Sequence, residues 1–231
     1  MSSSEWISFW NSKHSIYANA RHQTAHFQRI ADDIRRYAPV SGVMLDYGCG
    51  EALFADQVAA ATSRLILCEP APNVRTMLAG RLAGNSKVAV RKPEDIAAMA
   101  SQSLDTIVMH SVAQYLTEPE LEELIRLFRR LLKPGGLLVL GDVIPRRLSA
   151  LGDALALLRF GSKDGFFWAA LRSLIRSYFS DYWRLRKSLG LARYSEQQIV
   201  SKLEAAGFSA ERTRPNIGHN AKRMTILAYA R

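Results

Sequence analysis

Residues 43–52 constrain the fold of this chain more than any other stretch. They begin as an apolar run, pass Asp46, and reach a turn that contains Gly48 and Gly50. A helical pattern follows, so the stretch predicts a buried strand, a glycine turn and a helix. Glycine permits tight turns and close approach to a ligand, and a helix start offers free N–H groups. The unit is therefore typical of a site for an adenosine-containing ligand, with a plain tight turn as the alternative.

A second acidic residue supports the ligand interpretation. Glu69 follows the apolar run at 65–68, about 20 residues beyond the glycines, where a carboxylate can accept hydrogen bonds from ribose hydroxyls. NAD is disfavoured because Leu53 stands where its fingerprint has a third glycine, and Asp46 stands where an apolar residue is usual. An acid at Asp46 suits a ligand with an ammonium or sulfonium charge.

Two further segments complete a recognisable order of motifs. Residues 103–112 form an apolar run with a turn after it, and residues 131–140 contain Lys-Pro-Gly-Gly followed by another apolar run. Together with the glycine stretch, they resemble the class I S-adenosylmethionine-dependent methyltransferases of small-molecule type. In that family they are the fourth strand, and a helix end, turn and fifth strand. The resemblance covers residues 38–145 well and 194–231 loosely, whereas 146–193 match no motif of the family.

The resemblance implies an α/β fold with a doubly wound, mostly parallel seven-stranded sheet. Its last strand is antiparallel, and a helical insert precedes the last helix. Apolar runs near 208–212 and 224–230 fit the closing pair of strands. At 231 residues the chain is most simply one domain, 1–231. We expect a helical cap over residues 1–40, with an amphipathic helix from about 17 to 37, and a helical lid insert over 146–193.

The cofactor that the resemblance implies is S-adenosyl-L-methionine. The residues that would bind it lie in the glycine turn, at the strand ends and in the N-terminal cap. They are Asp46, Gly48, Cys49, Gly50, Glu69, Pro70, Glu94, Asp95, Ile96, His110, Ser111, Tyr115 and Tyr17.

Two neighbouring positions, Lys92 and Pro93, depart from the family pattern. The family generally has a short acidic turn that contacts adenine, but this chain has Lys92 where aspartate is common. Pro93 stands where a backbone N–H would donate. We still expect Glu94, Asp95 or Ile96 to contact adenine, but the aspartate and the backbone N–H that usually accompany such contacts are missing from this turn. In the cap, Arg21 and His22 are further candidates, beside Tyr17, for contact with the methionine carboxylate, and solvated bases are the alternative.

The chemistry requires little from the protein. Methyl transfer is an in-line displacement at a carbon that the sulfonium already activates, so positioning and exclusion of water dominate. No metal site is expected. A hydroxyl acceptor would need a base, and His110 and His219 are the candidate catalytic residues. The alternative is that His110 contacts the cofactor through its backbone and that its side chain is incidental.

Charge limits the partners without choosing one. The formal net charge is +10, and such a surface attracts anions. A small, lipophilic acceptor is the favoured substrate because the insert is rich in leucine and aromatic residues. A nucleic-acid methyltransferase is the rival within enzymes because of the charge, but it is not favoured, since the Asn/Asp-Pro-Pro-Tyr/Phe signature of many amino-methylating enzymes is absent after Met109. A non-catalytic adaptor that binds the cofactor and contacts a membrane or partner is the rival outside enzymes.

The insert carries most of this positive charge. Residues at helical spacing predict an apolar face of Phe167, Leu171, Leu174, Tyr178, Tyr182 and Leu185, with Arg172, Arg176 and Lys187 on the other side. Such a helix can pack as a lid, rest on an anionic membrane, or form an oligomer interface, and these alternatives stay open.

The sequence also indicates a compartment. Cys49 and Cys68 have no metal-ligand spacing and are expected to be free thiols in a reducing environment. The first residues lack the pattern of a secretory signal, and no run of 18 apolar residues is present. We therefore expect a cytoplasmic protein without a transmembrane segment.

Overall fold

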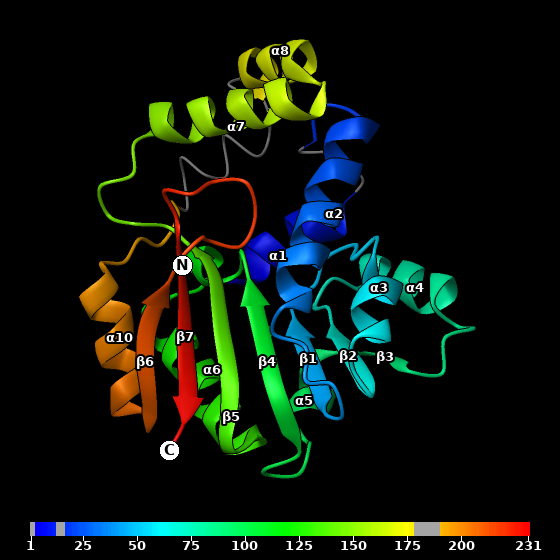
Figure 1. Ribbon diagram of the computed structural model, residues 1–231, viewed down its shortest axis with the longest axis vertical. Coiled ribbons are helices and arrows are strands. Elements are labelled where there is room, and N and C mark those ends of the chain that lie inside the picture. Colours follow the sequence, from blue (N-terminus) through cyan, green and yellow to red (C-terminus); the bar gives the residue numbers. More distant parts are fainter. Residues whose placement is uncertain (1–2, 13–16, 178–189) are drawn as a thin grey trace.

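A seven-stranded sheet runs through the middle of the protein (Figure 1). The computed structural model describes residues 3–12, 17–177 and 190–231. The strand order is β3-β2-β1-β4-β5-β7-β6, and β7 is antiparallel to both of its neighbours. The expected doubly wound sheet with an antiparallel last strand is confirmed. The strands are β1 (Val43–Tyr47), β2 (Arg64–Cys68), β3 (Val88–Arg91), β4 (Leu104–His110), β5 (Leu132–Val143), β6 (Phe208–Thr213) and β7 (Met224–Ala230).

Helices cover both faces of the sheet. On one face α2 (Ala20–Arg35), α3 (Ala55–Ala60) and α4 (Pro72–Arg81) pack on the strands, and on the other α5 (Pro93–Ala97), α6 (Glu118–Leu131) and α10 (Glu196–Ala205) do so. Successive side chains of a strand point to opposite faces, so Met44 joins the first core and Leu45 the second. Burial on both faces explains why the central strands read as continuous apolar runs.

The capping residues mark the helix ends that the sequence predicts. Thr117 and Glu120 form a capping box at the start of α6, and Ser195 and Gln198 form another at α10. Gly207, with φ +90°, follows the end of α10, where glycine commonly ends a helix. These signals are local, so they can be read from the sequence.

The Lys-Pro-Gly-Gly segment differs in detail from the expected turn. It belongs to β5, which begins directly after α6 at Leu132. The pairing with β4 shifts between Leu104–Leu132 and Thr106–Leu137, so the segment bulges from the ladder. Gly135, with φ +73°, takes the left-handed conformation there.

The N-terminal cap contains two helices. The helix expected from about 17 to 37 is α2, which starts at Ala20 because Asn19 caps the N–H of His22 at 2.8 Å. The sequence did not predict α1 (Ser3–Asn11). The side-chain oxygen of Asn11 accepts the N–H of Asn73 at 2.6 Å, which ties α1 to the start of α4.

The insert forms a helical hairpin above the carboxyl ends of the parallel strands (Figure 1). Its helices are α7 (Ala150–Asp164) and α8 (Phe167–Ser177). The predicted pattern fits α8, whereas α7 lies in the expected helical insert without a predicted pattern of its own. Its continuation through Tyr178, Tyr182, Leu185 and Lys187 lies outside the described residues. Within the described ranges, no helix is long and apolar enough to cross a bilayer.

Candidate functional site

A large cavity opens at the carboxyl ends of the parallel strands. Its volume is about 1550 Å³, and its walls come from the glycine turn, the ends of β2, β4 and β5, the N-terminal helices and the loop before β7. Typical ligand pockets measure roughly 300–1,000 Å³. The cavity therefore has room for a nucleotide-sized ligand and a second molecule beside it.

The glycine turn forms one wall of the cavity for a steric reason. Gly48 has φ +74°, and a Cβ there would lie 2.4 Å from Cγ2 of Val112. Gly50 has φ +58°, and a Cβ there would meet no atom within 4 Å, because that side of the turn faces the cavity. Only glycine permits this geometry without strain, and it leaves space for a ligand against the backbone.

Glu69 holds the turn in place and also faces the cavity. Its Oε2 accepts the N–H of Gly50 at 2.9 Å, and its Oε1 accepts the N–H of Ala71 at 2.8 Å. Each carboxylate oxygen has a second lone pair, so the group can still accept hydrogen bonds from the hydroxyl groups of a ligand. Burial raises the pKa of Glu69 above its ordinary value.

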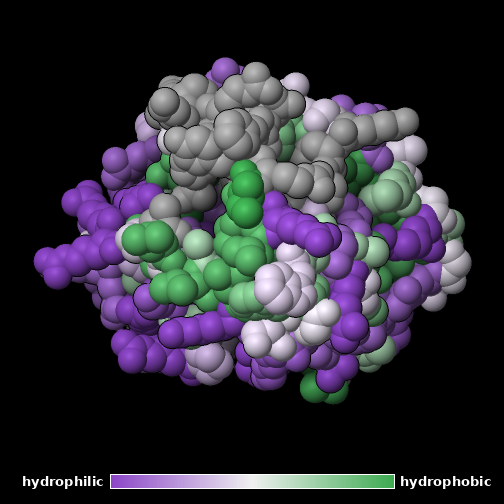
Figure 2. All heavy atoms as spheres, turned by 90° about the horizontal axis from the view of Figure 1, so that it is seen from above, coloured by the Kyte–Doolittle hydropathy of each residue, from purple (hydrophilic) through white to green (hydrophobic). Residues whose placement is uncertain are grey.

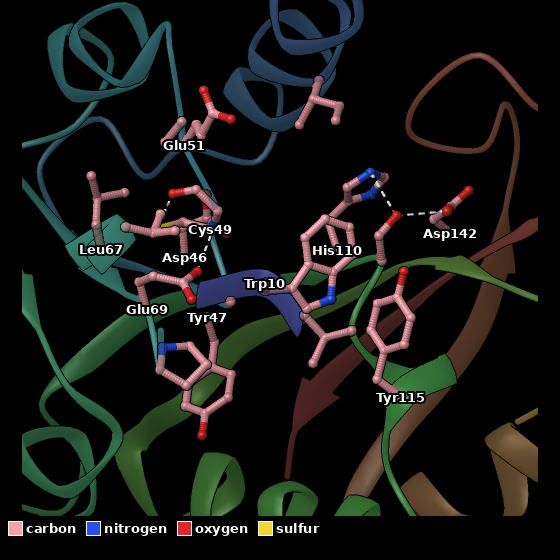
Figure 3. A pocket seen from close by; sticks show the side chains of 18 of the residues that line it. Trp10, Asp46, Tyr47, Cys49, Glu51, Leu67, Glu69, His110, Tyr115 and Asp142 are labelled. Atoms are coloured by element: carbon pink, nitrogen blue, oxygen red, sulfur yellow. Dashed lines mark hydrogen bonds between the residues drawn. The ribbon is translucent and has the colours of Figure 1, made fainter. Parts of the chain in front are cut away.

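Asp46 lies beside Glu69 at the end of the neighbouring strand (Figure 3). Burial and the nearby Glu69 carboxylate raise the pKa of Asp46 to about 7. A carboxyl group in this environment is costly to ionise without a positive partner. The group is therefore suited to meet a cationic part of a ligand.

The structure brings most of the predicted cofactor residues to one cavity. Its lining includes Tyr17, Asp46, Gly48, Cys49, Gly50, Glu69, Pro70, Glu94, His110, Ser111 and Tyr115. Both cysteines are free. Burial raises the pKa of the Cys49 thiol well above its ordinary value, so Cys49 is a neutral wall residue.

Two predicted adenine contacts are not among the residues that line this cavity. Pro93 starts α5, and the side chain of Asp95 turns back to accept the N–H of Lys92 at 3.2 Å. Ile96 is fully buried in the core beneath α6. Of the predicted segment 94–96, only Glu94 lines the cavity, next to Lys92 and Pro93.

Of the three candidate cofactor contacts in the N-terminal cap, only one lines the cavity. Tyr17 lines the cavity, but Nε of Arg21 donates to the carbonyl of Asp164 at 2.7 Å, at the end of α7. The ring of His22 stacks on Phe166 with centroids 4.7 Å apart, and its Nδ1 accepts the N–H of Ala18. Neither Arg21 nor His22 is among the residues that line the cavity. Both side chains instead attach the cap to the hairpin.

A hydrogen-bonded chain of side chains forms the opposite wall (Figure 3). The hydroxyl of Ser111 donates to Oδ2 of Asp142 at 2.6 Å, and its Oγ lies 3.2 Å from Nε2 of His110. Because the Ser111 hydroxyl donates its proton to the hydrogen bond with Asp142, Nε2 of His110 is the donor to Oγ and therefore carries a proton. Nδ1 of His110 is then unprotonated, and it has no hydrogen-bond partner among the described residues.

The backbone at this wall is strained. Ser111 has φ +57° and Asp142 has φ +64°, although neither is glycine. Such conformations cost of order 1–3 kcal/mol and persist only where surrounding contacts hold them. The N–H of Ser111 donates to the carbonyl of Gly141 at 3.0 Å, and the N–H of Asp142 donates to Oδ1 of Asn216 at 3.2 Å. The two strand ends are thus held so that both side chains face the cavity.

A partly buried arginine, with 18% of its side chain exposed, joins this wall to the hairpin. Arg223 pairs with Asp142 at 2.5 Å and with Asp153 of α7 at 3.3 Å. Burial acts to raise the pKa of Asp142, but the Arg223 guanidinium, the neighbouring imidazoles and the Ser111 hydrogen bond together outweigh that effect and hold the pKa below its ordinary value. Asp142 is therefore a charged acceptor for Ser111 across the neutral range.

Three imidazoles line the same part of the cavity. Burial lowers the pKa of His110 and His219 below the ordinary value, and it lowers that of His26 to about 3. The His219 ring stacks on Phe160 with centroids 4.8 Å apart. All three rings are consequently uncharged at neutral pH.

Aromatic residues of α1 complete the lining. The ring centroids of Trp6 and Tyr115 are 4.6 Å apart, and those of Trp10 and Tyr115 are 5.8 Å apart. In Figure 3, Trp10 lies between the acidic side, with Asp46 and Glu69, and the side that carries His110.

Some of the lining could not be identified from the sequence. Asp142 could have been, because it ends a buried strand at the carboxyl edge as Glu69 does. His26 and Arg223 carry no such signal, since they reach the cavity through the packing of α2 and of the loop before β7. His219, a candidate base from the sequence, lines the cavity together with its neighbours Gly218 and Asn220.

Comparison with known proteins agrees with this geometry. Residues 45–138 match the family model described as a methyltransferase domain. This part of the chain is therefore similar to a methyltransferase domain, and the fold is that of the class I S-adenosylmethionine-dependent methyltransferases. Comparison with curated proteins yields no match.

Three solved structures illustrate the shared methyltransferase fold. YcgJ from Bacillus subtilis is 12% identical, with a TM-score of 0.60, over 89% of this chain and 99% of that one. The N-methyltransferase NodS from Bradyrhizobium japonicum, in complex with S-adenosyl-L-homocysteine, is 15% identical with a TM-score of 0.57, over 99% and 97%. Phosphoethanolamine N-methyltransferase 1 from Haemonchus contortus is 17% identical with a TM-score of 0.53, over 64% and 34%. Identities this low establish a common fold and not a common acceptor.

Proposed function

We propose that this protein transfers a methyl group from S-adenosyl-L-methionine to a small, lipophilic acceptor. The observation that carries the proposal is that Asp46 and Glu69, at the carboxyl ends of adjacent strands and beside a glycine turn, line one cavity. The N-terminal helices act as the cap, and the α7–α8 hairpin as the lid, of a single domain.

The cofactor end has the groups that the cofactor needs. Gly50 leaves open space against the backbone, and Glu69 retains lone pairs for ribose hydroxyls. Asp46, with its raised pKa, is suited to the positively charged end of the molecule. Glu94 lies at the edge where adenine would sit, and Tyr17 closes the cap side.

The bound cofactor supplies an activated methyl group, and the residues of the chain bind, orient and exclude water. Trp6 and Trp10 of α1 line the cavity, and the hairpin lies above the strand ends at which the cavity opens. Exclusion of water and alignment of two reactants are the main sources of rate in such a displacement.

The acceptor end suits a lipophilic molecule that carries one polar group. Apolar and aromatic residues predominate in its wall, and the polar groups gather at His110, Ser111 and Asp142. If the acceptor atom is a hydroxyl oxygen, an uncharged imidazole can remove its proton. His110 and His219 both line this end and are the proposed bases, but the unprotonated Nδ1 of His110 is buried, so its ring would have to turn to reach an acceptor.

Calorimetric titration with S-adenosyl-L-methionine and S-adenosyl-L-homocysteine tests the cofactor site. We expect Glu69→Gln to weaken binding by about 1–3 kcal/mol, since it removes a charged acceptor. Glu123→Gln, on the exposed face of α6, is the matched control and leaves affinity unchanged.

Transfer is then measured with cofactor labelled on the methyl carbon and an organic extract of cells as a pool of acceptors. Label in an apolar product supports the proposed reaction. Binding without any transfer would favour the non-catalytic adaptor. Failure of the wild-type protein to bind either ligand would overturn the proposed function.

A further inference from the structure

The outer surface of the hairpin displays an unusual concentration of apolar side chains. Eight large hydrophobic residues are exposed in the described part of the chain, and five of them lie on α7 and α8. We call these five the apolar patch. They are Leu151, Leu155, Phe167, Trp168 and Ile175. A view onto the hairpin shows hydrophobic side chains gathered on this face with hydrophilic ones around them (Figure 2).

The patch is not a core surface that faces the wrong way. The inner side of α7 already has partners, because Phe160 stacks on His219 and Asp153 pairs with Arg223. Leu151 and Leu155 occupy the other side, with exposed fractions of 76% and 51%. Trp168 is 70% exposed on α8. Single exposed apolar residues are normal, but a contiguous set marks an interaction surface.

Basic residues accompany the patch on the same helices. Arg159 and Lys163 continue the exposed stripe of Leu151 and Leu155 at intervals of four residues, and Arg172 lies exposed on α8. The two acidic residues of these helices, Asp153 and Asp164, are both partly buried. The outward charge of the hairpin is therefore positive.

We propose that this face of the α7–α8 hairpin docks the protein on an anionic lipid bilayer. Leucine, isoleucine and tryptophan side chains enter the boundary between headgroups and acyl chains, while arginine and lysine attract anionic headgroups. Tryptophan is favoured at this depth because its ring is apolar and its N–H is polar.

Two other occupants fit the surface less well. In a symmetric dimer the patch would meet its own copy, so Arg159, Lys163 and Arg172 would face like charges. The phosphates of a nucleic acid would pair with the arginine and lysine side chains but would leave Leu151, Leu155 and Ile175 without an apolar partner. A bilayer satisfies both features at once.

The experiment is co-sedimentation of the full chain with vesicles of phosphatidylcholine alone and of phosphatidylcholine mixed with phosphatidylglycerol. We expect binding to the mixed vesicles that weakens with added salt, and weak binding to the neutral ones. The double variant Leu155→Ser/Trp168→Ser should reduce the partition coefficient by about tenfold or more, since it removes two of the five apolar side chains of the patch, one from each helix. Its matched control is Val40→Ser/Tyr229→Ser, which removes exposed apolar groups far from the hairpin.

A second pair of variants tests the charge. Arg159→Gln/Arg172→Gln should reduce the partition coefficient about fivefold for each base removed, the equivalent of about 1 kcal/mol per residue. Arg64→Gln/Arg126→Gln carries the same change in net charge on other exposed surfaces and should bind more tightly than the hairpin pair. Unchanged melting temperatures in all four variants show that the fold is intact.

Several outcomes overturn the proposal. These are equal partition of the hairpin and control variants, equal binding to both vesicle types, and absence of sedimentation with either. Sedimentation equilibrium that shows a dimer disrupted by Leu155→Ser/Trp168→Ser would assign the patch to a second copy instead. None of these measurements depends on methyl transfer, so they leave the proposed function untouched.

Discussion

Asp46 and Glu69 sit at the ends of neighbouring strands, yet their surroundings differ. Glu69 is stabilised by two backbone N–H groups, whereas burial and the charge of Glu69 leave the pKa of Asp46 at about 7. The Glu69 carboxylate holds the turn through hydrogen bonds, whereas the Asp46 carboxylate needs a positive partner to ionise at low cost. The structure adds this difference, because the sequence shows only two acids after two strands.

Asp46→Asn should separate stability from binding. The pKa of Asp46 lies above its unfolded value, so its ionised form destabilises the fold, and stability is lost as pH rises from about 4 to about 7. We expect the variant without ligand to be more stable than wild type by about 2–4 kcal/mol at pH 8, with a smaller gain at pH 5. Urea unfolding at the two pH values measures this.

The same substitution should change cofactor affinity in the opposite direction. Protonation of Asp46 removes its attraction for a cation, so wild-type affinity for S-adenosyl-L-methionine should fall as pH decreases through about 7. Asp46→Asn should bind more weakly at pH 8 and lose this pH dependence. Calorimetry between pH 6 and pH 8 checks it, and a parallel decline in both proteins would show that another group controls affinity.

The histidines make a separate prediction at the same scale. Burial lowers the pKa of His110 and His219, so their basic forms persist below pH 6.5 and turnover should decline only at more acidic pH. For a hydroxyl acceptor, substitution of the acting histidine by asparagine should lower turnover by about 10²–10⁴-fold with cofactor affinity intact. His22→Asn, outside the cavity lining, is the control. Full turnover in both His110→Asn and His219→Asn would remove the imidazole base.

At the scale of elements, what could be predicted followed from local signals. The strand before the glycine turn, the capping boxes of α6 and α10, and the closing strands β6 and β7 all carry their determinants within a few residues. The wall of Ser111 and Asp142 depends instead on the loop before β7, where Asn216 and Arg223 contact the end of β5. Such contacts span more than 70 residues, so no sequence window contains them. Asp95 and Ile96 were predicted to contact adenine but do not line the cavity, because α5 starts at Pro93 and turns their side chains away from it.

The Arg223–Asp142 pair should therefore be important for stability. Arg223→Met leaves Asp142 and Asp153 without their shared cation in a buried setting, and we expect a loss of about 3–5 kcal/mol in unfolding free energy. Arg212→Met is the matched control, because Arg212 pairs with one half-exposed acid, Glu196, and should lose much less. Chemical denaturation at neutral pH compares them. Equal losses would mean that the buried network contributes no more than a surface pair.

At the scale of the whole molecule, the cavity is closed by parts that are far apart in sequence. Trp6 and Trp10 arrive from α1, and His219 from the loop before β7, while Phe160 of the hairpin packs behind His219. A helical cap at residues 1–40 and a helical insert at 146–193 were expected, but the bounds of α1 and α7 within them were not, because each helix packs on parts of the chain that are distant in sequence.

Ligand binding should consequently stabilise α1 more than the far face of the sheet. α1 lies over the cavity with Trp6 buried and is tied to α4 by Asn11, so a ligand beneath it adds contacts to the closed arrangement. At a ligand concentration about 100 times the dissociation constant, the maximum gain is about 2.7 kcal/mol, or about 100-fold slower amide exchange. Hydrogen exchange with and without S-adenosyl-L-homocysteine should show residues 3–11 slowing toward this limit, while amides near the middle of α6 that open locally change little. Equal slowing in both helices would indicate that α1 opens only with global unfolding, and no slowing in α1 would indicate that the cap closes independently of the cofactor.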